Sequence, residues 1–123
     1  MTADFGAYVQ RTVLLPWEWG VQDCTMWAAD WCRLRWSFDP AAQFRGTYHD
    51  EAGAERMIAG GLIRLVGPHI ALARKHAPAE GDLGVIEVLD REVAAVWSGE
   101  HWHFRKPHGV GLVRRPALAI WGD

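Results

Sequence analysis

The spacing of apolar side chains changes near Gly81, and this change constrains the fold more than any other feature of the chain. Before it, apolar residues recur three and four positions apart, which is typical of helices packed on a core. After it, short β-branched and aromatic runs are separated by turn residues such as Ser98-Gly99, which is typical of strands. The sequence therefore predicts an α+β fold, with N-terminal helices packed on a small antiparallel sheet formed by the C-terminal half.

Two helices have clear start signals. Asp4 is a candidate N-cap for a helix over residues 5 to about 15, which Pro16 ends. Asp23 is a candidate N-cap for a helix over residues 24 to about 35, whose apolar stripe should face the core. Two further helical predictions cover residues 51–59 and part of 63–75, after Pro68.

The predicted strands are short and closely spaced. They span residues 83–89, 92–97, 102–105, 110–113 and 117–121. At 123 residues the chain has room for one core, so we expect a single domain over 1–123, helical over about 4–75 and β over about 82–121.

Composition excludes several classes of protein. The net charge is −2, with 13 basic and 15 acidic residues interspersed, so no basic patch for nucleic acid or an anionic membrane is expected. No apolar run approaches the roughly 18 residues that span a bilayer, and no basic leader segment begins the chain. Cys24 and Cys32, eight positions apart on one predicted helix, would lie about 12 Å apart along its axis, so both thiols should be free, as in a reducing cytoplasm.

Cys24 is the candidate nucleophile. A turn containing Gly20 leads to Asp23-Cys24 at the predicted helix start, where the helix dipole and unpaired N–H groups can stabilise a thiolate. Cysteine peptidases place their nucleophile at such a position. The alternative is that Cys24 is a small core residue, because it lies on the same helical stripe as Trp27 and Trp31.

Other short motifs accompany Asp23-Cys24 along the chain. They are Trp19-Gly20, Asp30-Trp31, Asp39-Pro40, Arg45-Gly46-Thr47-Tyr48, Gly60-Gly61-Leu62 and Gly81-Asp82-Leu83. In order and spacing the chain resembles the NlpC-type cell-wall cysteine peptidases of the papain-like superfamily. Over about residues 5–89 it is similar, more closely, to a family of small phage and prophage proteins encoded beside tail genes.

The resemblance implies a helix packed on an antiparallel sheet, with its cysteine facing a histidine on a strand. In this chain Glu92 stands at the strand position where those peptidases have the histidine that serves as general base. The third polar residue of such sites falls near His103. A glutamate beside Cys24 would raise the pKa of the thiol and would be a poor general acid at neutral pH. His103 is the other candidate base.

The histidines do not form a metal-binding motif. His101 and His103 flank Trp102 and would share one face of a strand, but no carboxylate or cysteine stands at a matching spacing. We expect no metal and no other cofactor.

Eight tryptophans are many for a chain of this size. Trp27, Trp31 and Trp97 are predicted to be in the core. Because so small a domain cannot bury all the others and exposed aromatic residues dominate interface hot spots, the rest are candidate interface residues. These candidates are Trp17, Trp19, Trp36, Trp102 and Trp121.

Two functions remain open from the sequence. The resemblance implies a phage tail-tip structural or assembly protein on a degenerate peptidase fold, made in the host cytoplasm, located in the virion tail and contacting tail-hub, distal-tail or tip proteins. The alternative is an active peptidoglycan endopeptidase that degrades the cell wall locally during DNA entry. They differ in whether Cys24 must react.

Overall fold

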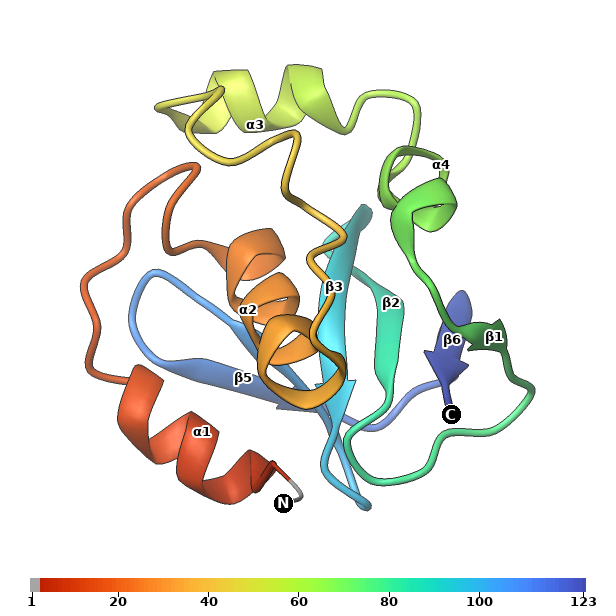
Figure 1. Ribbon diagram of the computed structural model, residues 1–123. Helices are drawn as coiled ribbons and strands as arrows, with labels where there is room; N and C mark the ends of the chain where they lie inside the picture. The colour runs from red at the N-terminus through yellow and green to blue at the C-terminus, as the bar shows by residue number, and fades with distance from the viewer. Residues whose placement is uncertain (1–2) are drawn as a thin grey trace.

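The computed structural model describes residues 3–123, which form helices on one side of a six-stranded antiparallel sheet (Figure 1). The helices are α1 (Phe5–Thr12), α2 (Cys24–Trp36), α3 (Glu51–Met57) and α4 (Leu62–Val66), followed by the 3₁₀ turn η1 (Gly67–His69). The strands are β1 (Ala73–Arg74), β2 (Leu83–Val88), β3 (Arg91–Trp97), β4 (Trp102–Arg105), β5 (Val110–Val113) and β6 (Ala119–Gly122). The predicted α+β class with an antiparallel sheet is confirmed.

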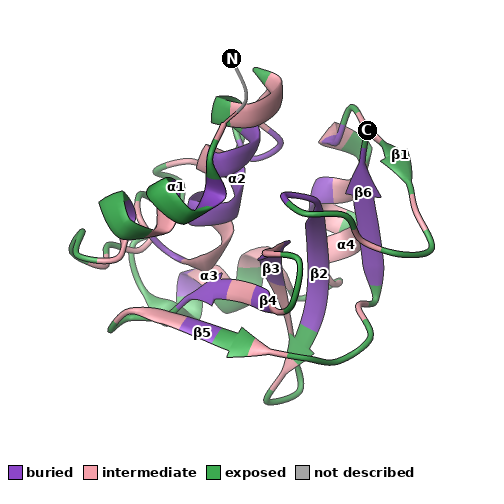
Figure 2. Ribbon diagram, turned by 90° about the horizontal axis from the view of Figure 1, so that it is seen from below, coloured by how far each residue is buried: buried purple, intermediate pink, exposed green. Residues whose placement is uncertain are grey.

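The order of the strands in the sheet is β1-β6-β2-β3-β4-β5. Strands β2 to β5 follow one another as antiparallel neighbours, whereas β6 lies between β1 and β2. Figure 2 shows β2 and β6 mostly buried and β5 partly exposed at the open edge. Within residues 3–123 no helix has the length and apolar character needed to cross a membrane.

Both predicted aspartate caps are present. The Asp4 carboxylate accepts a hydrogen bond from the N–H of Ala7, and that of Asp23 accepts one from the N–H of Met26. α1 ends at Thr12, before the predicted end near residue 15. The Arg105 guanidinium donates to the carbonyl of Thr12, which the sequence pattern of the helix itself could not indicate.

Helix α2 forms the centre of the core. Trp27 and Trp31 are fully buried, as predicted, and pack with Tyr8 and Phe5 of α1. The Tyr8 hydroxyl donates to the carbonyl of Trp27, so the two helices are joined by a hydrogen bond as well as by apolar contact. Aromatic packing of this kind stabilises the fold by more than the burial of apolar surface area alone would.

Three tryptophan predictions differ from the structure. Trp102 and Trp121 are only 2% and 3% exposed, so they are core residues and not candidates for a surface interface. The ring of Trp102 occupies the space above Gly84, where an added Cβ would lie 2.5 Å from it. Conversely, Trp97 is only partly buried, packed at an angle on Trp102. Glycine two strands away in the sheet creates room for the Trp102 ring, which strand alternation alone does not indicate.

The segment after α3 also differs from the prediction. Its α-helical part, α4, precedes Pro68, and only the turn η1 contains Pro68. Residues Ala73–Arg74 then form the edge strand β1, paired with β6. These residues form a strand because they pair with β6, which is distant in the sequence, and the local sequence gives no signal for this pairing.

Candidate functional site

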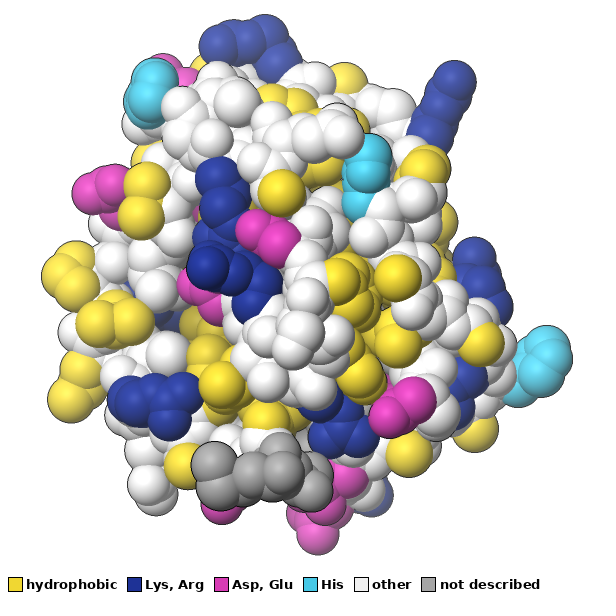
Figure 3. Space-filling model, in the orientation of Figure 1, with side chains coloured by type: hydrophobic (Ala, Val, Ile, Leu, Met, Phe, Trp, Pro, Cys, Tyr) yellow, Lys and Arg dark blue, Asp and Glu magenta, His cyan; other side chains and the backbone are white. Residues whose placement is uncertain are grey.

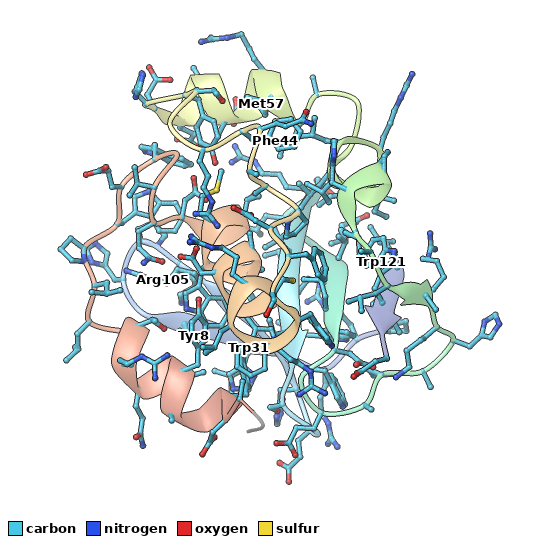
Figure 4. The ribbon with its side chains drawn as sticks, in the orientation of Figure 1. Tyr8, Trp31, Phe44, Met57, Arg105 and Trp121 are labelled. Carbon is cyan, nitrogen blue, oxygen red and sulfur yellow. The ribbon has the colours of Figure 1, made fainter. Side chains whose placement is uncertain are left out.

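A cavity of about 320 Å³ opens beside the start of α2. Its walls come from the loop before α2, the first turn of α2, the segment leading into α3, α3 itself and the start of β3. Leu65 of α4 and Pro107 after β4 complete the lining. Most of the lining is apolar, and Phe44 and Met57 lie close together above α2 on this side of the molecule (Figure 4). Cys24 and Glu92 both line this cavity, so the fold brings two of the three predicted site residues together.

Asp23 organises the walls of the cavity. Its buried carboxylate accepts hydrogen bonds from the N–H of Gly20, the N–H of Met26 and the hydroxyl of Tyr48. One side chain therefore caps α2 and also joins it to two loops. Gly20 has a φ of +79°, and a Cβ there would lie 2.5 Å from the carbonyl oxygen of Tyr48, so the close approach of these loops requires glycine.

A second polar cluster holds the segment that carries Phe44. The Arg45 guanidinium bonds to Asp39 within the segment and to Asp30 on α2. These charges belong to the motifs singled out in the sequence, and their observed role is to anchor this segment to α2.

The Cys24 thiol is held in its protonated form. Burial, followed by the charge of Asp23, raises the pKa of the thiol to about 11, and this outweighs hydrogen bonding at the helix start. At pH 7 about one thiol in 10⁴ is then a thiolate. An efficient cysteine nucleophile needs the opposite shift.

Glu92 has a structural partner. Its Oε1 accepts a hydrogen bond of 3.0 Å from the N–H of Ile63, at the start of α4. A Cβ on Gly61, whose φ is +99°, would lie 2.9 Å from Oε2, so the backbone closely surrounds this carboxylate. Glu92 thus joins β3 to α4 through this hydrogen bond.

His103 lies away from the cavity. It pairs with Val96 across β3 and β4, and Glu92 is four residues before Val96, which separates the two levels of the sheet by about 13 Å. The His103 ring packs edge-on against Phe5 of α1, and burial lowers the pKa of the imidazole. The described residues that line the cavity include no histidine.

Arg91 is a site residue that sequence reasoning missed. It begins β3, lines the cavity and forms ion pairs with Glu51 and Glu55 on α3. The i, i+4 spacing of the two glutamates places them on one face of a helix and indicates a cationic partner, but not which one. These pairs are half exposed, so they position α3 more than they stabilise it.

The three remaining tryptophan candidates are partly buried. Trp17 and Trp19 pack edge to face, with ring centroids 5.0 Å apart, and form one wall of the cavity. Trp36 lies at the other end of α2, beneath Arg35, and does not contribute to the cavity. The tryptophans near the site are therefore Trp17 and Trp19.

The surface carries no concentrated charge of one sign on the face seen in Figure 3, where basic and acidic side chains are dispersed. Within residues 3–123 no three His, Cys, Asp or Glu side chains cluster in a way that could hold a metal ion. The cavity itself is largely apolar, and its polar lining includes carboxylates, the Arg91 guanidinium, the Tyr48 hydroxyl and the Cys24 thiol.

Comparison with known proteins identifies the family. The model of a domain of unknown function, DUF6950, matches residues 1–122. No curated protein and no solved structure matches the chain. Because the match extends over almost the whole sequence, the protein belongs to the DUF6950 family.

Proposed function

We propose that this protein is a structural and assembly component of a phage tail tip, built on a papain-like, NlpC-type fold that has lost hydrolytic chemistry. In this role the cavity beside Cys24 binds a peptide segment of a neighbouring tail-hub, distal-tail or tip protein. The location rests on the resemblance of the sequence motifs, and the loss of chemistry rests on the site.

One observation carries the proposal: Cys24 shares its cavity with Glu92, at the position where the resemblance implies a histidine base. Glu92 accepts a hydrogen bond from Ile63, and the pKa of Cys24 is raised to about 11. A site with a neutral thiol and a structurally engaged carboxylate lacks both a nucleophile and an acid for the leaving amine. A largely apolar pocket of this size remains suited to binding.

The first experiment measures the release of soluble fragments from purified peptidoglycan by the wild-type protein and by Cys24→Ala between pH 5 and 9. We expect no release by either protein, while an active peptidoglycan endopeptidase digests the same material. One feature supports the alternative function, an active peptidoglycan endopeptidase: Cys24 stands at the first turn of α2 and borders the cavity. Release that disappears in Cys24→Ala would establish that alternative.

The second experiment tests binding. The protein is co-expressed with candidate tail-hub, distal-tail and tip proteins, and co-purification is compared for Ala54→Trp, which fills the cavity from α3, and Ala52→Trp, on the exposed part of the same helix. We expect Ala54→Trp to lose the partner and Ala52→Trp and Cys24→Ser to retain it. Partner binding that survives the filled cavity would contradict the proposal.

A further inference from the structure

The charge around the cavity distinguishes one class of peptide from others. Four carboxylates line it, but that of Asp23 is 1% exposed and accepts three hydrogen bonds, so a ligand can meet those of Glu51, Glu55 and Glu92. Among the described lining residues Arg91 is the only cation, and its guanidinium is already paired with Glu51 and Glu55. The mouth of an apolar pocket is thus acidic, without a free cation to attract a carboxylate.

The apolar interior of the cavity determines which kind of side chain the ligand can insert. Trp17, Trp19 and Phe44 form broad aromatic walls. From the α3 side, Met57 supplies a flexible thioether side chain and Ile58 a branched aliphatic one. The cavity volume of about 320 Å³ lies at the lower end of the roughly 300–1,000 Å³ of ligand pockets. It fits one large apolar side chain with the adjoining backbone, and methionine lets such a pocket adapt to different shapes.

Resting on the proposed function, we propose that the cavity takes a partner peptide in which a large apolar side chain stands next to a lysine or arginine. The apolar side chain fills the space between the tryptophan wall and α3. The neighbouring cation lies at the mouth, against the carboxylates of Glu55 and Glu92. An acidic segment would meet like charge there, which disfavours such partners.

The test selects peptides from a random heptapeptide display library on the wild-type protein and counter-selects on Ala54→Trp. Enriched sequences are synthesised with blocked ends and a fluorophore, and their dissociation constants are measured by fluorescence anisotropy. We expect a consensus with a large apolar residue beside a basic one. Binding should weaken by about tenfold or more in Ala54→Trp and stay unchanged in Ala52→Trp.

Charge is tested separately. In Glu55→Gln, Arg91 keeps Glu51 as its partner, and we expect affinity for the basic peptides to fall by about 2- to 5-fold, the range of exposed charge pairs. Replacing the basic residue of the peptide by glutamate should weaken binding further.

The outcomes separate this inference from the proposed function. Three outcomes would overturn the inference about the class of peptide: a consensus without a basic residue, an unchanged affinity when that residue is replaced, or no enrichment of peptides that depend on the cavity. The proposed function would then be tested by the co-purification experiment alone. Cleavage of a bound basic peptide, detected by mass spectrometry and lost in Cys24→Ala, would overturn the loss of hydrolytic chemistry while retaining the specificity.

Discussion

Replacing Asp23 by alanine removes more than a helix cap. Its carboxylate is 1% exposed and accepts hydrogen bonds from Gly20, Met26 and Tyr48. Alanine leaves the start of α2 uncapped and the other two donors without their acceptor, one of them the buried hydroxyl of Tyr48.

The magnitude follows from these contacts. Loss of the cap costs about 1 kcal/mol, and each of the two other donors, left in a buried setting, costs about 1–3 kcal/mol. The free energy of unfolding should therefore fall by roughly 3–7 kcal/mol. The matched control is Asp4→Ala, because Asp4 caps α1 through one exposed hydrogen bond and should cost only about 1 kcal/mol.

The assay is urea unfolding followed by tryptophan fluorescence, with circular dichroism as a second probe. The difference between the two variants is the informative quantity, since both lose one N-cap. If Asp23→Ala destabilises the protein no more than Asp4→Ala does, Asp23 does not organise the loops, and the cavity walls must be held by other contacts.

The other predictions concern reactivity and packing. Because burial and Asp23 raise the pKa of Cys24 to about 11, its alkylation by iodoacetamide, followed by peptide mass spectrometry, should rise about tenfold per pH unit from 7 to 10 without a plateau; a plateau near pH 8 would contradict the raised pKa. Glu92→His should speed the alkylation of Cys24 near pH 6 relative to Glu92→Gln, because the imidazolium is charged there and stabilises the thiolate, and identical rates would mean that the two side chains are not neighbours. Gly84→Ala should destabilise the protein by about 1–3 kcal/mol in thermal unfolding, because its Cβ would lie 2.5 Å from the Trp102 ring. Gly67→Ala, where a Cβ meets nothing within 4 Å, is its control and should differ little from wild type.

Much of the fold was predictable from local signals. The caps at Asp4 and Asp23 and the burial of Trp27 and Trp31 are confirmed, because each depends on residues close in sequence. The burial of Trp102 was not predictable, because it depends on Gly84, which is far away in the sequence and two strands away in the sheet. Periodicity determines which face a side chain occupies, but not what covers that face.

The site was predictable in part for the same reason. The sequence placed Cys24 at a helix start, and the structure shows Cys24 and Glu92 in the lining of one cavity. The sequence did not indicate that Glu92 would accept a hydrogen bond from Ile63, nor that His103 would pack on Phe5. Both contacts depend on how α4 and α1 pack on the sheet, which residue spacing does not encode.

The position of β6 has a consequence for how the chain folds. Strands β2 to β5 can pair in turn through short connections, whereas β6 must join β1 to β2, bringing Trp121 beside Leu83. Such distant pairing is slow, because a long loop has to close before any contact compensates for the lost entropy. Until β6 inserts, the buried residues of β2 stand at an unpaired edge, which is a template for association with other chains. The chain is therefore most prone to aggregate during the interval before its last strand inserts.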